Sequence, residues 1–158
     1  MPKVSAADYR ALAAFRHEIR KFLAFSESAA RAAGVEPQQH QLLLAVRGLP
    51  EGMRPTIGTL AERLCVQHHT AVALVDKLEA RGLIQRQRSG EDRREVLLRV
   101  TPEGEAVLRG LSSLHREQLK QAAPQVIGAL QKILGLYDGG SRRSSDCAEA
   151  SSVRPRGT

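Results

Sequence analysis

The sequence predicts a mainly α-helical fold that contains one small β-hairpin. Hydrophobic residues make up 42% of the 158-residue chain but aromatic residues only 3%. The apolar residues are therefore mostly Leu, Val and Ala, a composition that favours packed helices over sheets. They recur every three or four positions along most of the chain, which is the period of an amphipathic helix. Between residues 83 and 100 the period shortens to two, which indicates a pair of strands.

The first helix is expected over about residues 5–33. Ser5, followed three positions later by Asp8, is a helix N-cap pattern, and Gly34 is a typical C-terminal stop. Most of the chain's few aromatic residues lie on this helix. We expect its apolar stripe to form an interface or to line a pocket, and the stripe consists of Tyr9, Leu12, Phe15, Ile19 and Phe22.

A second and a third helix are expected next. Pro37 suits the first position of a helix that ends at Gly48, and the apolar centre of this helix implies burial on several sides. The segment 48–55 is rich in turn-forming residues. Thr56 then caps a short helix that carries apolar residues at helical spacing.

A fourth, longer helix is expected from about residue 67 to residue 81. A brief turn at Cys65 and Val66 separates it from the short helix, and Gly82 ends it. We expect Cys65 to be a small packed residue of this turn.

The strands and the last helices follow. The two strands are expected over residues 83–88 and 95–100. Thr101 and Pro102 are an N-cap and a first-turn proline, so a helix should begin there. We expect Pro124 to separate that helix from a final one that ends near residue 138. One domain is thus expected over residues 5–138, with its central lobe over about 37–104.

Residues 139–158 lose all apolar periodicity and are expected to form a disordered basic tail. The net charge of the chain is +7 and the isoelectric point about 10.1, a balance typical of proteins that bind polyanions. Charge alone equally suits a soluble basic protein or one attracted to anionic membranes.

The helix over 67–81 has the residues that a helix in a DNA major groove needs at its leading end. Small or polar side chains there can reach base edges or phosphates. The bland interpretation is an ordinary solvated helix start. Because a short helix precedes it and a basic hairpin follows, we assign the DNA-reading role to Gln67, His68, His69 and Thr70.

The hairpin that follows is rich in arginine. Between residues 81 and 99 the arginines outnumber the acids, and the alternative is a merely solvated basic turn. Arg93 and Arg94 fall near its tip, where guanidinium groups can enter a narrow minor groove. Asp92 is expected to orient a neighbouring arginine, and Arg88 is expected to contact DNA as well. A helix pair followed by such a hairpin is the anatomy of a winged helix-turn-helix.

Other classes of function lack support in the sequence. The longest strongly apolar run is about five residues, too short for a membrane span. Cys65 and Cys147 lie in no metal-binding or disulfide pattern, and the five histidines form no metal motif. No catalytic motif occurs. We therefore expect no catalytic residues, no cofactor and no metal, and a cytoplasmic protein.

The chain resembles the MarR-type (multiple antibiotic resistance regulator) family of bacterial winged-helix transcription regulators over roughly residues 8–138. The hairpin pattern is the most specific part: an Asp with Arg residues leads into a strand and then into Thr-x-x-Gly. The segments that carry the resemblance are PQQHQLLLAVRG (37–48), TIGTLAERLCVQHHTAVALVDKLEARGLIQR (56–86) and DRREVLLRVTPEG (92–104).

The resemblance implies a homodimer in which the N- and C-terminal helices, about 5–33 and 102–138, intertwine. It implies residues 67–72 in the major groove, Arg94 and possibly Arg93 in the minor groove, and Asp92 bracing the wing. Expected dimer contacts are Tyr9, Leu12, Leu111, Leu114, Leu130, Ile133 and Leu134. An effector pocket between the dimer helices and the lobe would be lined by Phe15, Ile19, Phe22, His40 and Leu44.

The sequence thus predicts a nucleoid-associated, sequence-specific regulator, a repressor, that reads a pseudo-palindromic operator as a homodimer and responds to a small molecule. Two alternatives stay open. One is a DNA-packing protein without sequence preference, and the other is a protein–protein interaction module that uses the winged fold without DNA.

Overall fold

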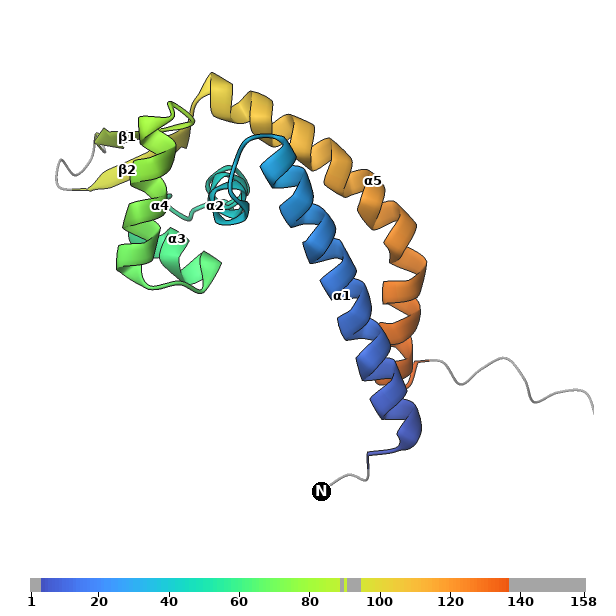
Figure 1. Ribbon diagram of the computed structural model, residues 1–158. Helices are drawn as coiled ribbons and strands as arrows, with labels where there is room; N and C mark the ends of the chain where they lie inside the picture. Colours follow the sequence, from blue (N-terminus) through green and yellow to red (C-terminus); the bar gives the residue numbers. More distant parts are fainter. Residues whose placement is uncertain (1–3, 89, 91–94, 137–158) are drawn as a thin grey trace, which may run out of the picture.

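The computed structural model describes residues 4–88, 90 and 95–136. Its helices and strands form two parts (Figure 1). The lobe consists of α2 (Pro37–Arg47), α3 (Ile57–Leu64), α4 (His68–Ala80), β1 (Ile84–Arg88) and β2 (Val96–Val100). The stem consists of α1 (Ala6–Ala32) and α5 (Pro102–Ile133), which lie side by side and extend away from the lobe. The mainly helical fold with one hairpin is as predicted.

Three side-chain caps start the helices where the sequence predicts. Ser5 and Asp8 form a reciprocal capping box before α1. The Thr56 and Thr101 hydroxyls accept hydrogen bonds from the backbone N–H groups of Thr59, at 3.2 Å, and Gly104, at 3.1 Å. Each cap satisfies an N–H that has no partner within the helix.

The wing is a two-stranded antiparallel sheet in which Ile84 pairs with Val100 and Arg88 with Val96. A third segment supports it, because the Leu98 N–H donates to the Pro55 carbonyl at 2.8 Å. An ion pair of 2.7 Å joins Arg54 to Glu95 at the start of β2. The loop before α3 therefore holds the strand that leads out of the wing.

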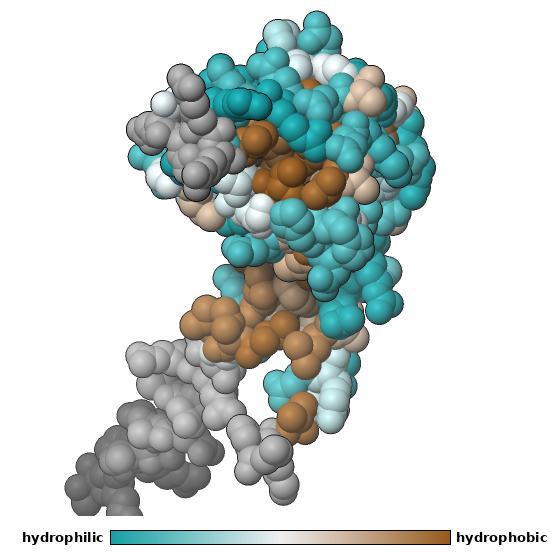
Figure 2. All heavy atoms as spheres, turned by 90° about the vertical axis from the view of Figure 1, so that its left-hand side faces the viewer, coloured by the Kyte–Doolittle hydropathy of each residue, from teal (hydrophilic) through white to brown (hydrophobic). Residues whose placement is uncertain are grey.

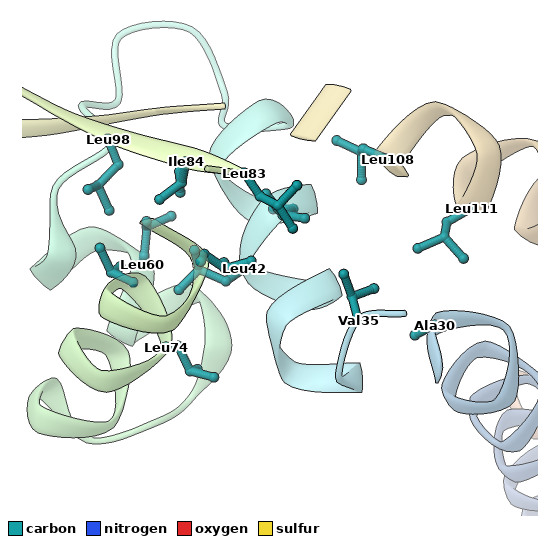
Figure 3. Close-up of a cluster of buried hydrophobic side chains, with 13 residues drawn as sticks. Ala30, Val35, Leu42, Leu60, Leu74, Leu83, Ile84, Leu98, Leu108 and Leu111 are labelled. Carbon is teal, nitrogen blue, oxygen red and sulfur yellow. The ribbon is translucent and has the colours of Figure 1, made fainter. Parts of the chain in front are cut away.

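The core joins the lobe to the upper stem. In Figure 3, leucines of α2, α3, α4 and the hairpin converge, with Leu42 and Leu60 fully buried among them. Leu108 and Leu111 of α5 and Ala30 of α1 extend the same cluster into the stem. These buried contacts fix the lobe against the upper stem.

Three expectations from the sequence are wrong. Pro124 lies inside α5 rather than between two helices. A proline can be accommodated in a long helix at the cost of one backbone hydrogen bond and a bend, and Figure 1 shows α5 curved along its length. Cys65 is exposed rather than packed, because it takes the left-handed conformation (φ 54°) that ends α3 and turns its side chain to solvent. The third is the expected dimer contact Leu111, which is only 1% exposed within its own chain and so is a core residue.

Among the described residues, no helix is long and apolar enough to cross a membrane. Within the same ranges, no cluster of three or more His, Cys, Asp or Glu side chains is arranged to hold a metal ion.

Candidate nucleic-acid interface and the adjoining cavity

The leading end of α4 is exposed and polar. Gln67 is the N-cap residue, but its side chain makes no capping hydrogen bond. His68 and His69 are exposed and Thr70 is half-buried. The opposite face of α4 is anchored in the core, with Val75 and Leu78 fully buried. The polar end is therefore held rigidly, with the positive end of the helix dipole facing solvent.

The arginines of the hairpin have different environments. Arg86 turns back onto α4, where its guanidinium bonds to Asp76 at 2.5 Å and also to Glu79. These carboxylates raise the pKa of Arg86, with the Asp76 hydrogen bond as the largest cause. Arg86 therefore attaches the wing to α4, and the two carboxylates compensate its positive charge. Arg88, at the end of β1, is exposed.

The remaining predicted wing residues, Asp92, Arg93 and Arg94, lie outside the described residues. The described strands on either side of this segment pair from Ile84 with Val100 to Arg88 with Val96 (Figure 1).

The junction after the wing explains its Thr-x-x-Gly pattern. The Thr101 hydroxyl accepts from Gly104 and also donates to the Gly82 carbonyl at 2.6 Å. A Cβ atom on Gly104 would overlap the Leu83 carbonyl oxygen, so no larger residue fits without movement. The pattern positions the wing, α4 and α5 relative to one another.

A cavity of about 590 Å³ lies between the stem and α2. Of the five predicted effector-pocket residues, Phe22, His40 and Leu44 line it, while Phe15 and Ile19 do not. Phe15 and Ile19 lie one to two turns earlier on α1, farther from the lobe. The sequence reasoning missed the contribution of α5, which includes Ser112, His115, Arg116, Leu119 and Lys120. The spacing of Leu111, His115 and Leu119 along one helical stripe was the available signal.

Two histidines form the inner wall of this cavity. The rings of His40 and His115 stack with centroids 4.9 Å apart, and the edges of Phe22 and Phe25 pack on His115. Burial lowers the pKa of both histidines, and the positive charge of His115 lowers the pKa of His40 further. Arg116 and Lys120 are exposed beside the pair, so the cavity combines an apolar interior with a cationic edge.

The stem carries large apolar side chains that its own chain leaves exposed. Figure 2 shows apolar atoms gathered on the stem below the lobe. Of the predicted dimer residues, Tyr9 is 65% and Leu134 66% exposed, and Leu12, Leu114 and Leu130 are exposed too. Ile133 is half-buried. Leu111 packs inside its own chain and is not available to a partner.

The known proteins that this chain resembles are transcriptional regulators. Residues 33–95 match the model of the MarR family. An uncharacterized HTH-type transcriptional regulator of Bacillus subtilis (strain 168), YfiV, is 30% identical over 66 residues. That match spans 42% of this chain and 41% of the relative, so the chain covers less than half of its length.

Solved structures share the fold over most of the chain. AbsC, a MarR family transcriptional regulator from Streptomyces coelicolor, is 18% identical with a TM-score of 0.65, over 85% of this chain and 93% of its own. A cysteine-to-serine mutant of MarR from E. coli, complexed with operator DNA, is 20% identical with a TM-score of 0.58, over 77% and 88%. The chain therefore resembles the MarR family over residues 33–95 and shares the winged helix-turn-helix fold of solved MarR family regulators.

Proposed function

We propose that the protein is a sequence-specific DNA-binding regulator, a repressor, that acts as a homodimer on a pseudo-palindromic operator. The observation that carries this proposal is the exposed polar end of α4, with Gln67 and His68 at its tip, beside a hairpin that presents Arg88. Gln can bond adenine through two hydrogen bonds, and arginine suits phosphates or a narrow minor groove. The solved MarR complex with operator DNA supports the same placement by analogy of fold.

The wing tip is proposed to enter the minor groove. Arg94 would insert there with help from Arg93, while Asp92 would brace the segment. We expect Arg94→Ala to weaken operator binding by about 1–3 kcal/mol. The measurement is titration of a labelled operator at physiological salt, with Arg10→Ala on the stem as the control that removes an equal charge far from the lobe. Unchanged affinity of the Arg94 variant would refute the minor-groove role.

Homodimerisation is proposed through the apolar surface of the stem. Exposed side chains such as Tyr9, Leu130 and Leu134 are large and apolar, and they extend over both stem helices. A two-fold dimer would present two α4 ends to half-sites about one helical turn apart.

An effector is proposed to bind in the cavity between stem and α2. Its apolar walls, with Arg116 and Lys120 at the edge, suit a small aromatic or anionic molecule. The cavity is lined by both the lobe and the stem. A bound effector would therefore favour one orientation of the lobe relative to the stem, and hence one spacing of the two α4 ends in a dimer. Release of operator by a panel of aromatic carboxylates is the direct assay.

Selection of duplexes from a random pool, followed by affinity measurement at fixed salt, tests the proposal as a whole. We expect a pseudo-palindrome to emerge and to bind at least about a thousandfold tighter than scrambled duplex. Equal affinity for both duplexes would favour a DNA-packing protein. No duplex binding at any salt would favour a protein–protein interaction module.

A further inference from the structure

The stacked pair His40–His115 has features that neither DNA reading nor dimerisation requires. His40 is 2% exposed and His115 8%, so both imidazoles are removed from water. Among the described residues, none is a hydrogen-bond partner of either ring nitrogen of His40 or of the Nε2 of His115. Buried polar atoms are usually paired, so three unpartnered nitrogens in one stacked pair need an explanation.

The pair lies at the joint between the two parts of the molecule. His40 belongs to α2 of the lobe and His115 to α5 of the stem, while Phe22 and Phe25 of α1 pack against His115. The stacked contact therefore joins the lobe to the stem directly. Any change that drives the rings apart acts on this joint.

Within the described part of the chain, a proton on either ring would find no compensating negative charge in the cavity. The neighbouring charged groups on α5 are Arg116 and Lys120, both cations, although Glu117 pairs with Lys120 at 2.7 Å. From α1 the cavity receives the neutral Phe22 and Ser26, and from α2 the neutral Gln41 and Leu44. None of the cavity-lining residues, all in the described part of the chain, is acidic.

The more distant neighbours do not change this balance. Glu18, one turn before Phe22 on α1, is paired with Lys21 at 3.2 Å. On the α4 side, Arg81 donates to Gln39, the residue beside His40. Within the described ranges, the group that favours a charged ring is the backbone of Ser26, through a hydrogen bond to His115.

We propose that the His40–His115 pair is a proton-sensitive joint. When neutral, the two rings stack and hold α2 against α5. In mild acid one ring takes up a proton, and the adjoining cavity supplies the space in which water hydrates the new charge as the rings separate. The lobe then moves relative to the stem, and the spacing of the α4 ends in a dimer changes. Only this last step rests on the proposed DNA-binding function.

Hydrogen exchange on the full chain without DNA tests the joint itself. After correction for the intrinsic pH dependence of exchange, we expect peptides from α2 and from the middle of α5 to exchange about tenfold faster near pH 5.5 than near pH 7.5, because a proton that binds mainly to the open form shifts the opening equilibrium by about that factor. The variant His40→Phe/His115→Phe keeps two stacked rings that cannot titrate, and its α2 and α5 peptides should lose this acceleration. Acceleration retained in the variant, or absent from the natural protein, would overturn the proposal.

A second measurement keeps the test valid if the double variant does not fold. NMR titration of the natural protein should show two histidines that protonate below the ordinary histidine range, with shifts in α2 and α5 amides at the same pH. Ordinary titration of all histidines would contradict the proposal.

DNA binding is measured separately over the same pH range. His68 and His69 are exposed near the proposed groove and would strengthen phosphate binding in acid, but both proteins retain them. The difference between the pH profiles of the natural protein and the double variant therefore isolates the buried pair. We expect the natural protein to lose about tenfold in affinity in acid relative to the variant. Failure of both proteins to bind DNA near pH 7.5 would refute the proposed function and leave the exchange result standing.

Discussion

Gly104 and Thr101 show how single residues set the geometry of the interface. The first turn of α5 rests on the backbone of Leu83, so closely that a Cβ on Gly104 would overlap the Leu83 carbonyl oxygen and lie 2.7 Å from a Val100 methyl group. The Thr101 hydroxyl simultaneously caps α5 and bonds the carbonyl of Gly82, where the chain leaves α4. A short polar cap and the absence of a side chain are therefore both required at this junction.

Gly104→Ala should destabilise the protein by about 1–3 kcal/mol, because the added methyl group must displace backbone or a packed valine. Gly110→Ala is a matched control in the same helix, since no atom of the described residues lies within 4 Å of the position of its Cβ. The control should be stabilising by about 0.5–1 kcal/mol through helix propensity. Urea unfolding compares the two, and equal stability of both variants would contradict the close approach.

The buried histidines give a second expectation at this scale. Burial lowers the pKa of both His40 and His115 in the folded state, so the unfolded chain binds more protons in mild acid. Stability should therefore be full above about pH 6.5, the ordinary histidine pKa, and fall as the pH drops below it. Urea midpoints of the natural protein and of His115→Phe, taken over about pH 5 to 8, measure this. A natural protein with the same acid response as the variant would contradict it.

At the scale of elements, the hairpin is attached to α4 by Arg86. Its guanidinium bonds to Asp76 and Glu79, and the Arg86 backbone N–H also donates to Glu79 at 3.1 Å. The sequence pattern groups all the hairpin arginines together as positive charge available to DNA. In the folded chain these arginines differ, because Arg86 forms ion pairs with Asp76 and Glu79 on one face of α4.

Arg86→Gln and Arg88→Gln should consequently differ. If Arg88 contacts a phosphate, its loss lowers the slope of log affinity against log salt by about one. Loss of Arg86 should weaken binding through a misplaced wing and leave that slope unchanged. Duplex titrations at several salt concentrations distinguish the two variants. A reduced slope for Arg86→Gln would mean that Arg86 itself contacts DNA.

The long helix α5 carries Pro124 in its interior. Proline there removes the backbone hydrogen bond to Lys120 and disfavours the preceding turn by about 3 kcal/mol in a free helix. We expect Pro124→Ala to raise the thermal unfolding midpoint and the helical signal in circular dichroism. A lower midpoint would indicate that the bend is needed for packing on α1 or on a partner.

At the scale of the whole molecule, the stem is a poorly buried pair of helices. Large apolar side chains remain exposed along both, among them Leu12, Ile127 and Leu130. A group of large exposed apolar side chains on one part of a molecule is typical of an association surface, which supports the proposed association of two copies through the stem.

Leu12→Glu/Leu130→Glu should accordingly shift the protein toward monomer in analytical ultracentrifugation, because the interface would have to bury two carboxylates from each protomer. Met53→Glu is the matched control, since Met53 is equally an exposed apolar residue (42%) but lies in the lobe. An unchanged sedimentation coefficient for the stem variant would exclude these residues from the interface.

The sequence by itself determined the local structure of this protein. Caps such as Ser5, Thr56 and Thr101, and the change of apolar period at residue 83, are short-range signals, because they act on backbone groups within a few residues. The resemblance to the MarR family likewise rests on local sequence patterns between residues 37 and 104, most of which lie within the span 33–95 that the family model matches.

Only the tertiary structure decided which side chains meet. It placed Leu111 in the core and left Cys65 exposed. It paired Arg86 with a carboxylate of α4 and stacked His115 on His40, which is distant in the sequence. Periodicity reports which face of a helix is apolar, but it does not report what that face meets. That choice depends on packing between elements distant in the sequence, which is why the joint between lobe and stem is visible only in the folded chain.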